Sequence, residues 1–478
     1  MYLAIPSDVY ARAYGEDVYL FNQTTWASVF VKNAKVFLNV FSRRPIRYDR
    51  VIKEVSDACK QSASVIRSDL MELIKPLIAD GFLLCGKTVD LDLPSISTFS
   101  RQHSTTCKAP RLLNGNNDKT SAESKENALS VAAPEDCLFE YFRNVPTPFE
   151  LDVDLTNACT EKCIHCYVSD FGACSLGLDL IKKVFGEFRE KGGLKVKLTG
   201  GECMLHRDFE KILQIARAHD FVISVLSNLT QCTSSHIDAM AEANVAVVQA
   251  SLYGADSMTH DTITRLEGSF EQTKKGIMTL LNRGIQVQIH CPVMKQNIHS
   301  IEAIKELGQR LGVKTTFDAA IMTRADHAKS NLDCLLSDVA LHQFLAREET
   351  EQSEFVGNIC VAAESPICNI GLARICLSAT GDYYPCSGCC EYILGNCRQM
   401  TLAEIWHSKR MEALRSIRFK DMSKCQKCKF IFYCKICPAR NYNSTRSLFD
   451  PDKVLCRISR TKYDIARERR LRDAGKTV

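Results

Sequence analysis

Three closely spaced cysteines, Cys159, Cys163 and Cys166, constrain this chain more than any other sequence feature. They follow Glu150–Leu155, whose alternating apolar residues predict a β-strand. A tetrahedral metal site takes four ligands, so three thiolates leave it one protein ligand short. In a cubane iron–sulfur cluster each iron binds one thiolate, so three cysteines leave one iron open to a non-protein ligand. The spacing therefore favours an iron–sulfur cluster with an open iron.

Composition narrows the class of protein. The chain has 478 residues, 45% hydrophobic and 24% charged, which is typical of a globular protein of two to four domains. Its net charge of +5 is too small to indicate a nucleic-acid partner. The segment Met1–Pro6 lacks the features of a signal peptide, and no apolar run is long enough to span a membrane. Clustered cysteines then predict a cytoplasmic metal protein and disfavour a secreted disulfide-rich one.

The chain between about 149 and 324 alternates strand and helix patterns, which predicts a parallel sheet of βα units. Six such units predict an α/β fold, a partial (βα)6 TIM-like barrel. The expected strands cover 150–155, 195–198, 222–226, 245–251, 286–290 and 315–319. The expected helices cover 178–190, 208–218, 235–243, 271–282 and 300–311.

Polar and glycine motifs follow these strands, at the end where such barrels gather their working groups. Thr199–Glu202 follows the second strand, Ser227-Asn228 the third and Ser251–Gly254 the fourth. Two glycines let a backbone approach a ligand closely, and Glu202 could accept a hydrogen bond from an ammonium group.

A second set of cysteines lies towards the C-terminus. Cys368 and Cys386 flank Gly381, and a denser group contains two Cys-x2-Cys pairs: Cys425, Cys428, Cys434, Cys437 and Cys456. Paired motifs of this kind suit zinc as well as iron–sulfur clusters. A four-thiolate zinc ribbon would leave the Cys368–Cys386 segment unexplained, so clusters are favoured and zinc stays open.

Residues 1–87 predict a separate winged-helix-like module, with an arginine group that would suit DNA: Arg43, Arg44, Arg47 and Arg50. The acidic residues among them, such as Asp49 and Glu54, favour a solvated face instead. The expected strands are 18–21, 27–31 and 82–85, and the expected helices are 34–41, with Asn33 as N-cap, 48–59 and 64–79. Residues 88–134 are polar and turn-rich, which predicts a partly disordered linker.

Together these motifs resemble the radical S-adenosylmethionine (SAM) enzymes that mature ribosomally made peptides, including those of the sactipeptide and ranthipeptide type. The resemblance covers a leader-peptide recognition element (1–87), a linker (88–134), a radical SAM barrel (135–345) and a SPASM iron–sulfur domain with a tail (346–478). It implies that residues 1–87 capture a leader peptide at a sheet edge. DNA binding and a purely structural role remain alternative functions for that module.

The resemblance also implies site residues. The cluster on Cys159, Cys163 and Cys166 would chelate SAM, Gly200, Gly201 and Glu202 would address its amino group, and Ser251 and Arg265 its carboxylate. Ser227 or Asn228 would bind the ribose, and His165 would cover the cluster or adenine. Two auxiliary [4Fe–4S] clusters would be held by Cys360, Cys368, Cys386 and Cys437, and by Cys425, Cys428, Cys434 and Cys456. The Cys434–Cys437 gap is one residue shorter than the family pattern, so Cys389, Cys390 or Cys397 could replace Cys437.

The implied function is hydrogen abstraction from a precursor peptide by an oxidoreductase that forms a thioether. The one-electron donor would be of the flavodoxin or ferredoxin type. Carbon–carbon crosslinking, epimerisation and formylglycine formation are alternatives, and the non-enzyme alternative is an iron–sulfur or zinc regulator with a DNA-binding winged helix. The sequence names neither the peptide nor the residue attacked.

Overall fold

A computed structural model describes residues 1–31, 34–41, 43–87, 134–169, 171–351 and 363–473. The chain forms two compact units, the first made of residues 1–147 with 220–222 and the second of 148–219 with 223–478. Asn33 and the expected linker up to residue 133 lie outside the described residues. No helix in the described part of the chain is long and apolar enough to cross a membrane.

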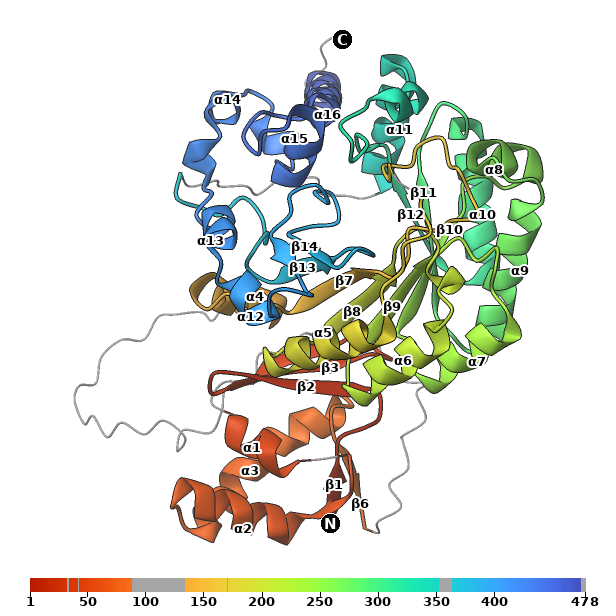
Figure 1. The fold of residues 1–478 in the computed structure, drawn as a ribbon. Helices are drawn as coiled ribbons and strands as arrows, with labels where there is room; N and C mark the ends of the chain where they lie inside the picture. Colours follow the sequence, from red (N-terminus) through yellow and green to blue (C-terminus); the bar gives the residue numbers. More distant parts are fainter. Residues whose placement is uncertain (32–33, 42, 88–133, 170, 352–362, 474–478) are drawn as a thin grey trace. The chain divides into compact units, whose positions relative to one another are not determined.

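The described residues of the first unit form two small antiparallel sheets and four helices, which Figure 1 labels. One sheet has the order β2-β3-β4 and the other β5-β1-β6. The strands are β1 (Tyr2–Ala4), β2 (Val9–Tyr14), β3 (Asp17–Asn22), β4 (Ser28–Val31), β5 (Ile46–Arg47) and β6 (Leu84–Gly86). The helices are α1 (Lys35–Val40), α2 (Tyr48–Cys59), α3 (Ala63–Ala79) and α4 (Pro134–Asn144). The predicted helices form here, whereas β1, β2, β5 and α4 had no clear sequence signal.

The second unit is built on a nine-stranded sheet in the order β12-β11-β10-β9-β8-β7-β13-β14-β15. Strands β7 to β12 are all parallel, and each pairs with its neighbours in sequence, as in a partial barrel. They are β7 (Glu150–Asp154), β8 (Lys195–Thr199), β9 (Val222–Ser227), β10 (Val247–Ser251), β11 (Val287–Pro292) and β12 (Lys314–Asp318). The predicted (βα)6 architecture is therefore confirmed.

Helices follow the strands along the outer face of the sheet (Figure 1). They are α5 (Leu178–Glu190), α6 (Phe209–Ala218), α7 (Ser234–Glu242), α8 (Ser257–Thr264), α9 (Ser269–Asn282), α10 (Ile301–Leu311) and α11 (Asp338–Glu351). Helix α8 was not predicted from the sequence. It begins where Asp256 Oδ1 accepts a hydrogen bond from Thr259 N at 2.8 Å, which caps its first turn.

The cysteine-rich part continues the same sheet. Strand β13 (Arg374–Leu377) pairs in parallel with β7, so that Ile375 lies opposite Leu151. Strands β14 (Asp382–Tyr384) and β15 (Gly395–Asn396) follow in antiparallel pairing, and Gly381 turns the chain at φ +90°. Helices α12 (Leu402–Trp406), α13 (Lys409–Arg415), α14 (Ser423–Gln426), α15 (Pro438–Thr445) and α16 (Lys453–Asp473) complete the unit.

Candidate functional site

The three cysteines of the first motif lie on one loop after β7. They line a cavity of about 360 Å³. Helix α8 fixes the loop, because Lys162 N donates to Thr264 O at 2.9 Å and Ile164 N donates to Ile263 O at 3.0 Å. A helix that the sequence did not predict therefore holds the cysteines in place.

The loop after β8 meets the cysteine loop backbone to backbone. Gly201 N donates to Thr156 O and Glu202 N donates to Ala158 O, each at 2.7 Å. A Cβ atom on Gly201 would lie 2.3 Å from Ala158 O, and Gly200 has φ +129°. Only glycine satisfies both conditions, so the two glycines are needed to join these loops. Both also line the cavity.

Glu202 does not line this cavity, in contrast to the simplest sequence expectation. Glu202 is 1% exposed, and its carboxylate accepts hydrogen bonds from four donors, one of which is Cys203 Sγ at 3.8 Å from Oε1. Ser227 Oγ lies 2.8 Å and Met204 N 3.1 Å from Oε1, and Asn228 N lies 2.8 Å from Oε2. Burial raises the pKa of this carboxyl. Glu202 therefore ties the end of β8 to the end of β9.

The other predicted SAM contacts divide into two groups. Ser227, Asn228 and Ser251 line the cavity at the ends of β9 and β10. Arg265 is exposed, ends α8 in a left-handed conformation and does not line the cavity. Nearby, Asp261 accepts hydrogen bonds from Gly268 N, Ser269 Oγ and Phe270 N at 2.7–2.9 Å, which orders the start of α9.

Two buried polar atoms at the cysteine loop have no hydrogen-bond partner in the described part of the chain: His165 Nδ1 and Glu161 Oε1. The His165 ring packs edge-on against Tyr253 with centroids 4.7 Å apart. Burial, followed by the nearby His290, lowers the pKa of His165 to about 4. Burial raises the pKa of Glu161 to about 7, although Cys163 Sγ donates to Oε2 at 3.1 Å. Unpaired buried polar atoms are costly, so these two are suited to contact a bound group.

The sequence analysis missed several residues of the cavity wall. His290 comes from β11, Asp318 ends β12, and Arg440 comes from α15. Tyr253, which lies in the predicted Ser251–Gly254 motif after β10, also lines the cavity. The strand-end rule that located Ser227 and Ser251 would also have located His290 and Asp318. No local pattern indicated Arg440.

Arg440 fastens α15 to the end of the barrel. Its side chain is 9% exposed, and it forms an ion pair with Asp452 Oδ2 at 3.0 Å. It also donates to Ala320 O at 2.8 Å and to Ile321 O at 2.5 Å. Through these contacts the cysteine-rich part forms one wall of the cavity.

A second cavity of about 470 Å³ adjoins the first. Asp318, Ala320 and Arg440 line both cavities. Its other walls include the apolar side chains of Phe344 and Leu345, and it reaches Cys437. The space beside the three-cysteine loop therefore extends to the second set of cysteines.

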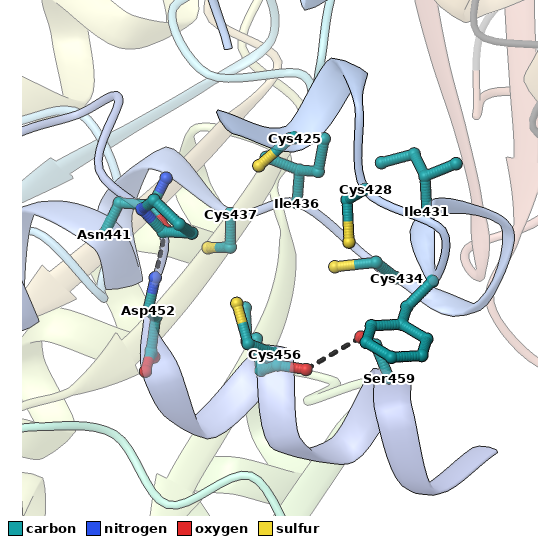
Figure 2. Close-up of a pocket in the computed structure, with 13 residues that line it drawn as sticks. Cys425, Cys428, Ile431, Cys434, Ile436, Cys437, Asn441, Asp452, Cys456 and Ser459 are labelled. Atoms are coloured by element: carbon teal, nitrogen blue, oxygen red, sulfur yellow. Dashed lines mark hydrogen bonds between the residues drawn. The ribbon is translucent and has the colours of Figure 1, made fainter. Parts of the chain in front are cut away.

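Figure 2 shows the densest part of that second set. The sulfur atoms of four cysteines point towards a common space: Cys425, Cys428, Cys434 and Cys456. Cys437 also lines this cavity, but its sulfur atom points away from the other four. They come from α14, from α16 and from the loop between α14 and α15. Among the residues that the structure describes, no three Cys, His, Asp or Glu side chains are placed to hold a single metal ion. Four thiolates around a common space could hold a cubane cluster, and four thiolates are also a structural zinc set.

The remaining cysteines form a neighbouring group. Burial raises the pKa of Cys368 to about 12, and the nearby Cys437 and Cys386 add to this shift. Cys389 is fully buried, and its N–H donates to Cys386 O at 2.7 Å. Cys360, the fourth expected ligand, lies outside the described residues. Cys437 lies beside this group: burial, and to a smaller extent the nearby Cys386, raises the pKa of its thiol. The structure thus brings Cys368, Cys386 and Cys437 of the expected set together.

Two family profiles match the chain. The Radical SAM superfamily profile matches residues 153–308, from β7 to α10. The profile of the SPASM iron–sulfur cluster-binding domain matches residues 368–429. The first contains the three-cysteine loop, and the second contains Cys368, Cys386, Cys425 and Cys428.

Two curated relatives match more than half of the chain. An AdoMet-dependent heme synthase from Nitratidesulfovibrio vulgaris is 26% identical over 61% of this chain and 87% of its own. The antilisterial bacteriocin subtilosin biosynthesis protein AlbA from Bacillus subtilis is 26% identical over 63% of this chain and 69% of its own.

A solved structure shares the fold over nearly the whole chain. SuiB from Streptococcus suis, bound to precursor peptide SuiA, superposes with a TM-score of 0.59. It is 16% identical, and the match covers 95% of this chain and 99% of SuiB.

Proposed function

Because the chain is a radical SAM protein with a SPASM iron–sulfur domain, we propose that it modifies a ribosomally made precursor peptide and forms a thioether in it. A relative named for bacteriocin biosynthesis and the fold shared with a peptide-bound protein support a peptide substrate. The proposed setting is the cytoplasm, with a one-electron donor protein.

The observation that carries this proposal is the adjacency of the cavities. The three-cysteine cavity shares three lining residues with a larger cavity, which in turn reaches Cys437. A peptide segment in the larger cavity would lie between the SAM site and the auxiliary cysteines. Its apolar wall at Phe344 and Leu345 would take an apolar side chain.

SAM and the cluster on Cys159, Cys163 and Cys166, when bound, supply the one-electron chemistry that removes a hydrogen atom from the substrate. The residues of the chain orient the groups. Ser227, Asn228 and Ser251 are proposed to bind the ribose and carboxylate of SAM. The Gly200-Gly201 backbone is proposed to face its ammonium group, positioned by Glu202. Arg265 lies outside the lining and has no support as a contact.

Thioether formation sets a requirement on electrons. Carbon loses one hydrogen atom, the peptide thiol loses one proton, and joining carbon to sulfur leaves one surplus electron. The auxiliary clusters proposed on the second set of cysteines would accept it. Cys437 lines the larger cavity, so one of these clusters would lie beside the substrate. Carbon–carbon crosslinking has the same requirement, whereas epimerisation leaves no surplus electron.

The first unit is proposed to bind the leader peptide by adding it to a sheet edge. Such an edge needs an unpaired strand, and β2 and β4 are the outer strands of the sheet β2-β3-β4.

The similarity to heme synthases supports a second candidate, a heme-related substrate. That similarity covers 61% of the chain, whereas the fold shared with SuiB covers 95%.

The test is an anaerobic reaction of the reconstituted protein with SAM, dithionite and a short peptide encoded beside its gene. We expect 5′-deoxyadenosine and a peptide that has lost two hydrogen atoms for each crosslink. The variant with Cys159, Cys163 and Cys166 all changed to Ala should form neither. An unmodified peptide alongside turnover of a heme precursor would reject the peptide proposal.

A further inference from the structure

Positive charge is concentrated beside one set of cysteines. Residues 422–449 contain four Lys and two Arg and no Asp or Glu, although the whole chain has a net charge of only +5. Three of the lysines flank the Cys-x2-Cys pair directly, in the order Lys424-Cys425-Gln426-Lys427-Cys428-Lys429. The charge therefore belongs to the same loop as the auxiliary cysteines.

The structure places these lysines on the surface. Lys427 and Lys429 are exposed, and neither forms an ion pair with another described residue. Lys429 Nζ lies 5.0 Å from the ring centroid of Phe430 and 5.9 Å from that of Tyr463. Lys424 is partly neutralised by Asp450 at 2.5 Å. We call Lys427, Lys429 and the 59% exposed Phe432 the lysine patch.

The lysine patch adjoins one of these cysteines in the chain, because Cys428 lies between Lys427 and Lys429. Cys428 and Cys434 are half-buried and Cys456 is exposed, and all three line the same cavity as Phe430 and Ile431. Electron transfer rates fall steeply with distance, so a cluster held there would be within reach of a molecule docked on the patch. An apolar residue surrounded by charges is also the usual make-up of a small, transient protein interface.

We propose that the lysine patch is the docking surface for an acidic one-electron carrier protein with an exposed flavin or iron–sulfur group. Opposite charges would steer the encounter and make its rate depend on ionic strength. One electron passes between the carrier and the cluster on Cys425, Cys428, Cys434 and Cys456, with no bond made or broken. In turnover the oxidised carrier removes the electron that the cluster has accepted from the substrate, and in the test below the reduced carrier supplies one to the oxidised cluster. The docking site itself rests on the proposed function only in assuming that those cysteines hold a cluster.

The test uses the full-length chain with Cys159, Cys163 and Cys166 changed to Ala, so that the auxiliary sites are the only electron acceptors. A reduced bacterial flavodoxin is the probe, and flavin absorbance follows its oxidation in a stopped-flow mixer. Binding of oxidised flavodoxin is measured separately by calorimetry. Lys427→Glu with Lys429→Glu is the test pair. Lys191→Glu with Lys275→Glu makes the same charge change on exposed lysines elsewhere.

We expect the test pair to slow flavin oxidation and weaken binding about tenfold at low salt, and less at high salt, because salt screens exposed charges. The control pair should match the parent. Equal rates for the two pairs, or an effect that salt does not reduce, would overturn the proposal. So would weaker binding of the precursor peptide with flavodoxin binding unchanged.

Two further measurements distinguish the loss of docking from the loss of the clusters and from a failure of the proposed function. Iron content checks that the test pair keeps its clusters, and if it does not, the neutral pair Lys427→Gln with Lys429→Gln replaces it. An intact neutral pair with parental rates would also reject the docking site. Peptide modification driven by dithionite tests the proposed function independently, since dithionite needs no docking surface.

Discussion

Gly201 lies where the loop after β8 touches the cysteine loop after β7. The contact leaves no room for a side chain at this position. The cysteine loop and the glycine loop exchange backbone hydrogen bonds at 2.7 Å. The position of the three thiols therefore depends on the absence of a single Cβ atom. Misplacement by about 1 Å is enough to cost an enzyme on the order of a hundredfold in rate.

We predict that Gly201→Ala lowers 5′-deoxyadenosine release at least about tenfold, because its Cβ would lie 2.3 Å from Ala158 O and push the loops apart. Gly186→Ala is the matched control, since a Cβ there meets nothing within 4 Å. The control should keep full activity and gain about 0.5–1 kcal/mol in the free energy of unfolding of its helix. Normal SAM cleavage by Gly201→Ala would contradict this account of the loops.

Asp154 gives a prediction about pH. Burial raises its pKa from 3.8 to about 6, opposed by a hydrogen bond from Tyr384 Oη at 2.5 Å and aided by Asp152. The carboxyl is protonated below the unfolded pKa in both states, and above about 6 the folded state bears the cost of a buried charge. Its contribution to stability is therefore present at low pH and lost as pH rises through about 6.

Asp154→Asn keeps an acceptor for Tyr384 and removes the charge. The melting temperature of the variant relative to the parent should therefore rise between pH 5 and pH 8, by about 2 °C or more. Differential scanning fluorimetry under anaerobic conditions measures both proteins. A difference that stays constant with pH would show that the carboxyl is ionised without penalty.

At the scale of elements, helix α15 joins two sites. Cys437 lies at its N-terminus and Arg440 in its first turn, where the guanidinium reaches the carbonyls after β12. Asp452, the partner of Arg440, is 2% exposed. A short helix thus connects the second set of cysteines to the wall of the three-cysteine cavity.

Arg440→Met should lower the free energy of unfolding by about 3–5 kcal/mol, because it leaves the buried Asp452 carboxylate without its cation. The double change Arg440→Met and Asp452→Leu should recover most of this loss. Anaerobic urea titration measures all three proteins. If the double variant is no more stable than the single one, the ion pair does not explain the loss.

Cys437→Ala should lose iron, up to about four atoms per chain if one cubane is released. Cys397→Ala is the comparison, since Cys397 is buried, does not line the cysteine cavity, and donates its N–H to Gly381 O at 2.8 Å. Colorimetric iron analysis decides between them. If Cys397→Ala loses iron and Cys437→Ala does not, Cys397 is the cluster ligand and Cys437 is not.

At the scale of the whole molecule, the two compact units suggest a division of labour. All three cavities discussed above belong to the second unit. Removing residues 1–87 should abolish modification of a leader-bearing peptide and leave uncoupled SAM cleavage intact. Chromatography and mass spectrometry of one reaction measure both. Unchanged modification would remove the support for leader binding.

The sequence predicted the barrel well because its signals are local. A buried parallel strand such as β9 is an apolar run, and α5 and α10 have clear apolar faces, so their predicted bounds agree with the structure to within one residue at most positions. Helix α8 is short and was missed. The pairing of β13 with β7 joins residues more than two hundred positions apart, and no local pattern encodes it.

For the candidate site, too, the sequence located some of the residues that line the cavity and gave no signal for others. Cysteines and glycines have characteristic spacings, so Cys159, Cys163, Cys166, Gly200 and Gly201 were located together. Glu202 was placed on the right loop, but its neighbours on β9 determine where its carboxylate points. Arg440 depends on tertiary contact alone, and the larger cavity could not be foreseen for the same reason.

The pairing of β13 with β7 has a consequence for inheritance and truncation. The family profiles treat residues 153–308 and 368–429 as separate modules, yet one hydrogen-bonded ladder runs through both. A chain cut after α11 would leave the backbone of β7 bare along one side, and bare strands recruit other chains. We therefore expect the barrel to aggregate when it is expressed without its iron–sulfur extension. We also expect the two parts to be inherited together.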